Sequence, residues 1–364
     1  MKRRTVLIPK VLLGTLLLLA SAGVHAAEVI GGWTLAEPDY DQELLTRLDQ
    51  EINAGIFREI NSIVVIRDGK LLIERYYNGA DRDTPHNPRS VGKTFAGTVL
   101  GIAIDQGYVS GADAHLSEFY QLADYANYSP EKAAVSLREL ITMTSGFEGY
   151  DFDMESVGNE EYMYPQPDWV RWTLDLPMAK DHAPGEEWRY FTAGIVVLGD
   201  ILNRSVPGGL EAYAHQQLFA PLGIDNYEWQ HTPQKVANTA GGLQLTPLDF
   251  AKYGELYRKR GRWEGEQIVP QAWVEASLAP LVETTVPGNR YGYLWWNKTY
   301  TVGEEGWLTA YCSGNGGNKI FVFEQQKLVV VITASAYGRP YMHTQVDEIM
   351  VDYLLPAVKP AAGS

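Results

Sequence analysis

The 364-residue sequence contains a single cysteine, Cys312. One cysteine cannot form a disulfide within the chain. The sequence also lacks a His-Glu-x-x-His motif and any Cys/His cluster with the spacing of zinc ligands. Neither a structural nor a catalytic zinc site is therefore expected, and we expect no metal site.

Basic residues are scarce. Lys and Arg number 30 against 45 Asp and Glu, and the formal net charge is −15. Four of the basic residues, Lys2, Arg3, Arg4 and Lys10, lie at the N-terminus, so the rest of the chain is more acidic still. An acidic surface repels nucleic acid and anionic membranes, and we expect no nucleic-acid partner.

Long apolar runs are missing as well. The run at residues 11–20 is too short to span a bilayer comfortably. It follows a basic start and precedes Val24-His25-Ala26, where small residues occupy the cleavage positions. Residues 1–26 are thus typical of a secretory signal peptide, with a retained N-terminal anchor as the alternative. We expect residues 27–364 to be periplasmic or secreted, without stable membrane insertion after cleavage.

Predicted strands lie near both ends of the chain, with helices between them. A hairpin is expected around Asp68-Gly69, a strong two-residue turn signal. Residues 108–262 are mainly helical in pattern, and a final helix is expected over 343–355. Further strands are expected at 291–296, 307–313, 319–324 and 328–334.

This order predicts an α+β fold. The N- and C-terminal strands would share one antiparallel sheet flanked by helices, with a mainly helical lobe inserted. We expect one domain over residues 27–364. Its α/β lobe would cover about 27–107 and 263–364, and its helical lobe about 108–262.

The stretch from Arg89 to Gly107 combines a serine with an apolar helical pattern. Ser90 lies just before the pattern. Lys93 is three residues after Ser90, on the same helical face. Unpaired N–H groups and the helix dipole favour developing negative charge at a helix start. A lysine with a lowered pKa could take the serine proton. The alternative is a plain helix cap.

Ser-x-x-Lys by itself is a weak signal, because Ser129-Pro-Glu-Lys132 also matches it. There the serine is expected to cap a short helix that begins with proline. Gly-x-Ser-x-Gly is absent, which excludes the nucleophile elbow of α/β-hydrolases. The acidic run Asp151, Asp153 and Glu155 fits a solvated loop better than an acid/base pair.

Three motifs follow one another in an informative order. They are Ser90-Val-Gly-Lys93, Trp188-Arg-Tyr190-Phe-Thr192 and Cys312-Ser-Gly-Asn-Gly-Gly317. Their order and spacing resemble the serine β-lactamase and penicillin-binding-protein superfamily, in particular its class C-like branch of carboxylesterases, peptidases and aminohexanoate-dimer hydrolases. The resemblance runs from about residue 60 to the C-terminal helix.

The resemblance implies roles for individual residues. Ser90 would be the acylated nucleophile, and Lys93 and Tyr190 would transfer protons, with the base in each half-reaction left open. A phenol titrates near ~10, so Tyr190 would need a nearby cation such as Lys93 to act as phenolate. The alternative for Tyr190 is a buried hydrogen-bonding tyrosine. The N–H groups of Ser90 and Asn315 would form an oxyanion hole.

Two positions depart from the family pattern. Thr192 replaces the usual Asn and loses an amide donor. Cys312-Ser313-Gly314 stands where Lys-Thr-Gly or His-x-Gly is usual, so the cation that binds a β-lactam carboxylate is missing. Arg290 or Lys319 are candidates to replace it. We expect Thr192, Cys312, Ser313 and Gly314 to contribute to substrate binding, with Cys312 packed within its strand.

Together these patterns predict a secreted serine hydrolase that cleaves a small ester, amide or peptide without a cofactor. Alternatives are a β-lactamase or D,D-peptidase of the same superfamily, or a non-catalytic protein that binds cell-wall peptides on this fold.

Overall fold

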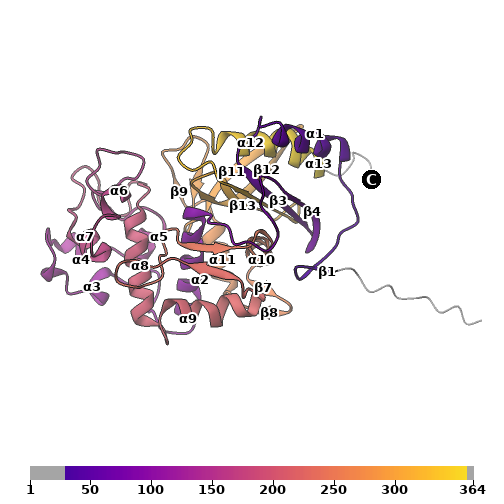
Figure 1. Cartoon of the computed structure of the whole chain (residues 1–364). Coiled ribbons are helices and arrows are strands. Elements are labelled where there is room, and N and C mark those ends of the chain that lie inside the picture. Colours follow the sequence, from indigo (N-terminus) through magenta and orange to yellow (C-terminus); the bar gives the residue numbers. More distant parts are fainter. Residues whose placement is uncertain (1–28, 359–364) are drawn as a thin grey trace, which may run out of the picture.

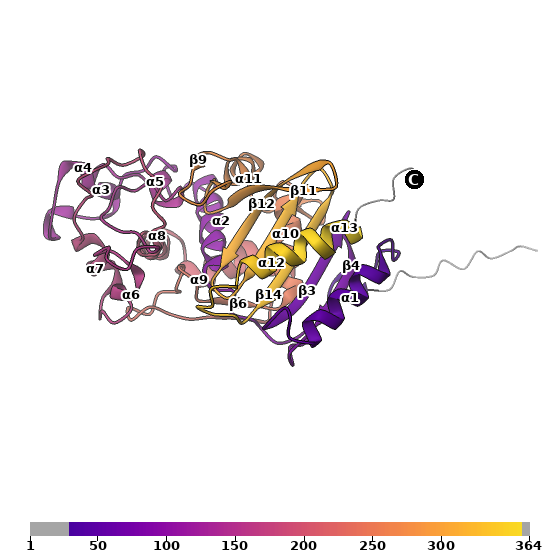
Figure 2. The same cartoon turned by 90° about the horizontal axis from the view of Figure 1, so that it is seen from above.

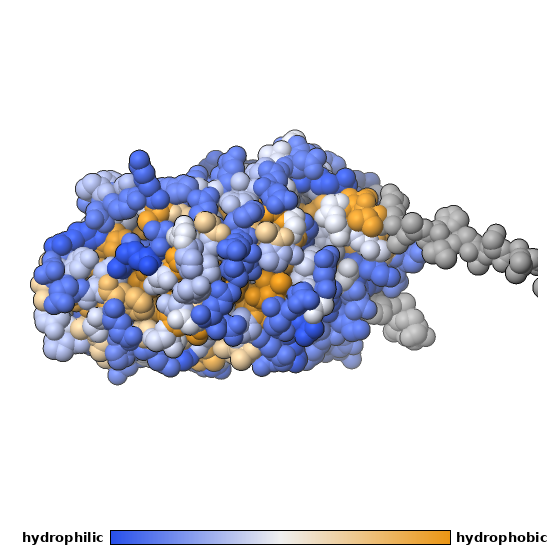
Figure 3. All heavy atoms as spheres, turned by 90° about the horizontal axis from the view of Figure 1, so that it is seen from below, coloured by the Kyte–Doolittle hydropathy of each residue, from blue (hydrophilic) through white to orange (hydrophobic). Residues whose placement is uncertain are grey.

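The protein was examined as a computed structural model, which describes residues 29–358 (Figure 1). The predicted signal peptide, residues 1–26, lies outside the described residues. Within the described part of the chain, no helix has the length and apolar character needed to cross a membrane. The face seen in Figure 3 is largely hydrophilic, with scattered apolar patches.

An eight-stranded antiparallel sheet is the centre of the larger lobe. Its strand order is β4-β3-β14-β13-β12-β11-β10-β9, so the N-terminal hairpin pairs with the last strand of the chain. This confirms the predicted sheet. Its strands are β3 (Ile60–Arg67), β4 (Lys70–Tyr76), β9 (Val282–Glu283), β10 (Arg290–Tyr291), β11 (Trp296–Val302), β12 (Glu305–Gly314), β13 (Asn318–Phe323) and β14 (Leu328–Ala334).

Helices cover both faces of this sheet. On one face lie α1 (Gln42–Asn53), α12 (Thr344–Ile349) and α13 (Leu355–Val358), as Figures 1 and 2 show. On the other face α10 (Pro247–Arg258) packs against β13 and β14, although it falls in the range expected for the helical lobe. Gly254 permits this contact, because a Cβ there would lie 2.6 Å from a methyl group of Val329.

The second lobe is a group of mostly short helices at one end of the sheet (Figure 2). Local capping explains where several of them begin. Ser136 forms the predicted capping box with Glu139, and Ser129 caps the helix that starts at Pro130, as expected. The helices are α3 (Leu116–Phe119), α4 (Pro130–Ala133), α5 (Leu137–Ile141), α6 (Glu160–Met163), α7 (Trp169–Asp175), α8 (Thr192–Ser205) and α9 (Leu210–Ala214).

The remaining strands have two or three residues each, and one further α-helix has eight. They are β1 (Val29–Ile30), β2 (Trp33–Thr34), β5 (Tyr227–Trp229), β6 (Leu243–Leu245), β7 (Arg262–Trp263), β8 (Glu266–Gln267) and α11 (Gln271–Leu278).

Helix α2 (Gly92–Asp105) lies between the two lobes (Figure 2). Every residue from Gly92 to Ala103 is buried, so this part of the helix has no solvent face despite its one-sided apolar pattern, and the helix reaches solvent at Asp105. Small residues make this burial fit. A Cβ at Gly101, for example, would lie 2.4 Å from the Trp273 ring. As predicted, Gly107 has a positive φ of 77° just beyond the helix.

The expected strand at residues 291–296 is wrong in its middle. Only its ends pair, with Tyr291 in β10 opposite Trp296 in β11. Between them the chain turns at Leu294, whose φ is 65°. The aromatic alternation therefore belongs to a tight connection, whose rings pack into the core.

Candidate active site

Ser90 and Lys93 face each other at the start of α2. Ser90 lies in a 3₁₀ turn, Arg89–Val91, directly before the helix. The Lys93 amine donates hydrogen bonds to Ser90 Oγ at 2.7 Å and to the carbonyl oxygen of Ala240 at 2.6 Å. Lys93 is only 1% exposed, and this burial lowers its pKa, which favours a neutral amine able to accept the serine proton.

The Ser90 turn is held in an unusual backbone conformation. Arg89 has a φ of 55°, and its N–H donates to Asn87 Oδ1 at 3.0 Å. The end of β12 presses against this turn, because a Cβ on Gly314 would lie 1.8 Å from the Pro88 carbonyl oxygen and 3.2 Å from Ser90 N. Only glycine fits at that position, so Gly314 brings the strand next to the Ser90 backbone.

Tyr190 adjoins both residues from the segment before α8. The Lys93 amine lies 5.3 Å from the centre of its ring. Phe152 stacks on the same ring with centroids 5.3 Å apart. Burial is the largest influence on the Tyr190 hydroxyl and raises its pKa, while a hydrogen bond from Ser90 opposes that shift. The phenol is thus held protonated, contrary to the phenolate that the proximity of Lys93 suggested.

In the third motif, the residues that follow the cysteine line the pocket, and the cysteine itself does not. Cys312 is fully buried, with Sγ 3.4 Å from Thr94 Oγ1, and burial raises the pKa of its thiol. This confirms its expected packing within the strand. Ser313, Gly314 and Asn315 line a pocket together with Ser90, whereas Cys312 does not. Ser90 and Asn315, the residues of the predicted oxyanion hole, thus line the same pocket.

Thr192 does not reach the pocket lining either. Its side chain is fully buried, and its hydroxyl has no hydrogen-bond partner within residues 29–358. Its N–H donates to Asp151 Oδ2 at 2.6 Å. Thr192, which replaces the usual Asn, thus contacts a carboxylate through its main chain. This carboxylate lies at the N-terminus of α8, where the helix dipole favours negative charge.

The pocket around Ser90 has a volume of about 340 Å³, and residues of both lobes line it. Its walls include aromatic rings from Phe152, Tyr190, Trp296 and Tyr311. Charged side chains also line the pocket, and of these Lys298, Asp347 and Glu160 were not expected from the sequence. A larger, more open hollow of about 540 Å³ contains none of the predicted site residues.

One charged group comes from the sheet. Lys319 in β13 stands opposite Ser313 in β12, and its amine donates to Ser313 Oγ at 3.0 Å. Lys298 in β11 pairs with Asp347 of α12, which also accepts a hydrogen bond from Tyr300 at 2.6 Å. Burial and the neighbouring Lys298 lower the pKa of Lys319 to about 7. Arg290, the other candidate cation, is exposed and does not line the pocket.

The other charged group comes from the helical lobe. Asp151 and Glu160 both line the pocket, and the N–H of Glu160 donates to Asp151 Oδ1 at 2.9 Å. Burial, together with repulsion from Glu160, raises the pKa of Asp151 to about 7. The solvated-loop interpretation is therefore wrong for Asp151, although Asp153 and Glu155 are exposed as expected. Local spacing gave no signal for Glu160, because the loop between the two carboxylates folds back.

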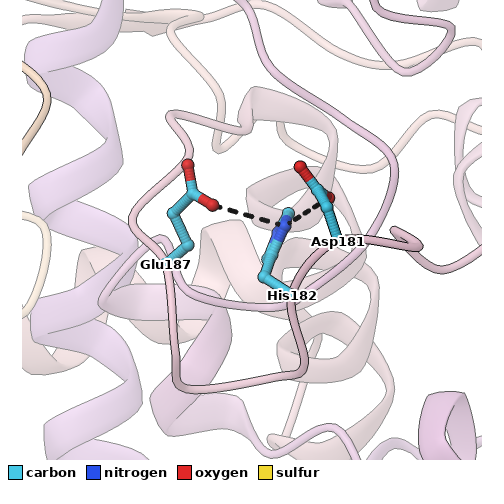
Figure 4. Close-up of side chains that lie close together, drawn as sticks. All are labelled: Asp181, His182 and Glu187. Atoms are coloured by element: carbon cyan, nitrogen blue, oxygen red, sulfur yellow. Dashed lines mark hydrogen bonds and ion pairs between the residues drawn. The ribbon is translucent and has the colours of Figure 1, made fainter.

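Another acidic cluster lies outside this pocket. His182 Nδ1 is 2.8 Å from Asp181 Oδ1 and 3.5 Å from Glu187 Oε2 (Figure 4). The Arg189 guanidinium also contacts both carboxylates, at 3.2 Å and 3.0 Å. Both carboxylates thus already have partners in the His182 ring and the Arg189 guanidinium. The cluster is an ion-pair network that fastens the loop immediately before Tyr190, rather than a set of ligands awaiting a metal.

Comparison with known proteins agrees with this geometry. A sequence model of the beta-lactamase family matches residues 55–350. The chain belongs to the beta-lactamase family of hydrolases. It is 25% identical over 229 residues to a 6-aminohexanoate-dimer hydrolase of Paenarthrobacter ureafaciens, covering 60% of this chain and 57% of the relative. The chain spans about half the length of the curated relatives it matches.

Solved structures share the fold at low sequence identity. EstCE1, a hydrolase with promiscuous acyltransferase activity, superimposes with a TM-score of 0.68 at 17% identity, over 84% of this chain and 98% of that one. A class C beta-lactamase mutant gives a TM-score of 0.59 at 17% identity, over 84% and 94%. The predicted superfamily resemblance and fold are confirmed.

Proposed function

We propose that this protein is a serine hydrolase that cleaves an ester or amide through an acyl-enzyme on Ser90. The observation that carries the proposal is the 2.7 Å hydrogen bond from the Lys93 amine to Ser90 Oγ, in a pocket that Tyr190 also lines. A buried amine with a lowered pKa is suited to accept a proton. Membership of the beta-lactamase family and the relative named a 6-aminohexanoate-dimer hydrolase support this reading.

The contacts suggest a division of labour between the two proton-transfer groups. Neutral Lys93 takes the Ser90 proton while Oγ bonds to the substrate carbonyl carbon and the carbonyl electron pair moves onto oxygen. The N–H groups of Ser90 and Asn315 stabilise that oxyanion. As the tetrahedral intermediate collapses, the bond to the leaving group breaks. Tyr190 gives its proton to the leaving group and regains one from Lys93.

Water then replaces the leaving group, and the same groups act in reverse. Water gives a proton to the base, its oxygen bonds to the acyl carbon, and the bond to Ser90 Oγ breaks with return of the proton to serine. Because Lys93 and Tyr190 share these protons, they titrate as one coupled system.

A fluorophosphonate probe tests the nucleophile. We expect the purified protein to be labelled at Ser90, with the adduct located by mass spectrometry, and Ser90→Ala to remain unlabelled. Ser129→Ala, which alters the second Ser-x-x-Lys sequence, is the matched control and should label like the parent. A folded parent protein that reacts neither with this probe nor with a fluorescent penicillin would contradict the proposal and favour a binding protein.

A substrate panel separates the hydrolase classes. We expect turnover of short-chain esters and linear amides to exceed that of a chromogenic cephalosporin. The sequence argument against β-lactamase activity was a missing cation, and Lys319 now places one beside Ser313. Rapid cephalosporin hydrolysis would therefore assign the protein to the β-lactamases, and release of a terminal D-alanine to the D,D-peptidases.

We also propose that residues 1–26 direct the protein out of the cytoplasm. The support is the basic start, the short apolar run and the small residues of Val24-His25-Ala26. Expression of the full chain in a Gram-negative host, with fractionation and N-terminal sequencing, tests this. A mature N-terminus at Ala27 in the periplasm is expected, and an intact N-terminus in the cytoplasm would contradict it.

A further inference from the structure

The two N–H groups of the proposed oxyanion hole belong to segments that are distant in the sequence. Ser90 ends the segment that leads into α2, whereas Asn315 lies in the turn between β12 and β13. An oxyanion is stabilised when both donors point at it from about 2.7–3.1 Å. The two segments must therefore be held at a fixed separation.

One buried side chain bonds to both segments. Asn318, the first residue of β13, is 1% exposed. Its Nδ2 donates to the main-chain carbonyl oxygen of Asn315 at 2.8 Å, and its Oδ1 accepts from His86 Nε2 at 2.8 Å. His86 lies four residues before Ser90, and its main-chain N–H donates to the carbonyl oxygen of Leu245 at 2.9 Å. The Asn318 amide thus joins the turn that carries Asn315 to the segment that leads to Ser90.

Main-chain groups set the orientation of this amide. Oδ1 also accepts from the main-chain N–H of Ala334 at 3.0 Å, a group that can only donate. The Asn315 carbonyl can only accept, so Nδ2 must face it. Burial lowers the pKa of His86, so the ring is neutral with one N–H, and its bond to Oδ1 places that hydrogen on Nε2. A flip of the Asn318 amide would break all three hydrogen bonds.

The turn depends on such a contact because two glycines follow Asn315. Gly316 and Gly317 have φ values of 93° and 92°, in a region that glycine adopts readily and other residues do not. The same conformational freedom lets the turn move when its contacts are lost. The Asn315 side chain accepts from the Gly338 N–H at 2.8 Å, but this bond is exposed to water. The bond from the buried Asn318 amide is the better shielded of the two.

We propose that Asn318 is a positioning residue for the oxyanion hole and that His86 acts through it. Neither residue lines the pocket around Ser90. Asn318 holds the N–H of Asn315 at the separation from the N–H of Ser90 that the tetrahedral intermediate requires. A misplacement of about 1 Å in such a site can lower the rate about 10²-fold. This inference rests on the proposed acyl-enzyme function and adds two residues to the machinery of that site.

Asn318→Asp tests the proposal with a nearly isosteric change. It keeps an acceptor for Ala334 and His86 but removes the donor to Asn315, so two oxygens face each other at that contact. We expect kcat for a short-chain ester to fall about tenfold to a hundredfold, with KM changed by less than about threefold. The loss is in kcat because the oxyanion exists in the transition state and not in the bound substrate.

The matched control is Thr309→Val. Thr309 is a buried residue of β12, and its Oγ1 donates to the carbonyl oxygen of Val322 in β13 at 3.0 Å. The variant therefore removes a buried hydrogen bond between the same two strands without touching the turn. We expect it to lower the melting temperature and to leave kcat and KM at the parent values.

A boronic acid gives a readout that a loss of stability alone does not move. Ser90 Oγ bonds to the trigonal boron of phenylboronic acid while its proton passes to Lys93, and the resulting tetrahedral anion places an oxygen in the oxyanion hole. We expect the inhibition constant of phenylboronic acid to rise in Asn318→Asp by about the factor by which kcat/KM falls, and to be unchanged in Thr309→Val.

His86 provides a second and milder test. His86→Gln keeps a side-chain N–H that can donate to Asn318 Oδ1, whereas His86→Leu removes it. We expect His86→Leu to lower kcat severalfold and His86→Gln to retain most of the parent value. This pair decides the question if Asn318→Asp does not fold.

The outcomes distinguish the inference from the proposed function. Parent kcat in a folded Asn318→Asp protein, or a fall in kcat/KM without a matching rise in the inhibition constant, would overturn the inference. Equal kcat in the parent, His86→Gln and His86→Leu would overturn it where Asn318→Asp does not fold. In those cases labelling of Ser90 in the parent by the fluorophosphonate would still support the hydrolase. Absence of labelling and of all ester turnover in the parent would instead contradict the proposed function, and the inference with it.

Discussion

The amine of Lys319 lies 3.0 Å from the hydroxyl of Ser313, its partner across β12 and β13. A cation is thus present beside the third motif although the motif itself contains none. Its position depends on strand register, because residues directly opposite on an antiparallel pair lie close together.

The first prediction concerns pH. The pKa of Lys319 is lowered to about 7, so its amine is charged below that pH and becomes neutral as pH rises through it. We expect KM for carboxylate substrates to increase above about pH 7, and KM for neutral esters to stay constant. The surrounding groups are Ser313, Lys298, Asp347, His343 and Tyr311, whose ring centre lies 4.7 Å from the amine. Burial lowers the pKa of His343 to about 3 and raises that of Tyr311, so both rings stay neutral.

Lys319→Gln is the control for this pH dependence. It carries no titrating amine and should show a constant, weak KM for carboxylate substrates across the same range. A rise in KM with pH that persists in Lys319→Gln would assign the effect to another group.

A second prediction concerns Tyr190. Tyr190→Phe removes the hydroxyl but keeps the ring that stacks on Phe152. We expect kcat to fall by about 10²- to 10⁴-fold, the range for loss of a proton-transfer group, with little change in thermal stability. Tyr150→Phe, in the preceding loop, removes a hydroxyl that contacts Thr285 and should retain activity. Full activity of Tyr190→Phe would exclude the proposed proton transfer.

A third prediction tests the contact between β12 and the Ser90 turn. The methyl group of Gly314→Ala would lie 1.8 Å from the Pro88 carbonyl oxygen, so strand and turn must separate. We expect labelling of Ser90 to be lost or slowed severalfold and the melting temperature to fall. Gly306→Ala on the same strand meets a methyl group of Thr299 at 3.1 Å and should be tolerated. Normal labelling of Gly314→Ala would show that the close approach is dispensable.

A fourth prediction links Asp151 to stability. Its pKa in the folded protein is raised to about 7, above an unfolded value near ~3.9, so the folded state binds more protons between these pH values. The free energy of unfolding therefore decreases as pH rises from about 4 to 7. Asp151→Asn should remove this contribution, so its stability relative to the parent should increase over that interval in urea titrations. A difference that is independent of pH would contradict the raised pKa.

The fifth prediction separates Cys312 from catalysis. Its thiol is buried against Thr94, and burial raises its pKa, so it is not a nucleophile. Cys312→Ala should label with fluorophosphonate at the parent rate and lose about 1 kcal/mol of stability through lost packing. Loss of labelling in a folded Cys312→Ala protein would show that the residue positions the active site more directly.

The contact between Ser90 and Lys93 was predictable from their spacing, because the two residues are one helical turn apart. Tyr190 was proposed from the resemblance of the second motif to the family pattern, and its place before an apolar helix agrees with the periodicity there. The sheet was predictable from the hairpin at Asp68-Gly69 and from the apolar strands near the C-terminus. Each of these signals is local, and local signals depend little on how distant segments meet.

The charged walls could not be predicted in the same way. Lys298 and Asp347 meet because β11 and α12 are neighbours in space, although 49 residues separate them. Asp151 lines the pocket whereas Asp153, two residues later, is exposed. The main-chain N–H groups of Thr192 and Glu160, which donate to the Asp151 carboxylate, hold it in that position. The packing of α10 against the sheet likewise depends on a distant contact, that of Gly254 with Val329, which helix propensity does not reveal.

The oxygen that anchors Lys93 opposite Ser90 belongs to the main chain of Ala240. Every amino acid carries that oxygen, so no single substitution at position 240 deletes it. A replacement at position 240 affects the anchor only through the packing of the new side chain, because Ala240 is buried. A shift of the segment by insertion or deletion is the kind of genetic change that would release the lysine.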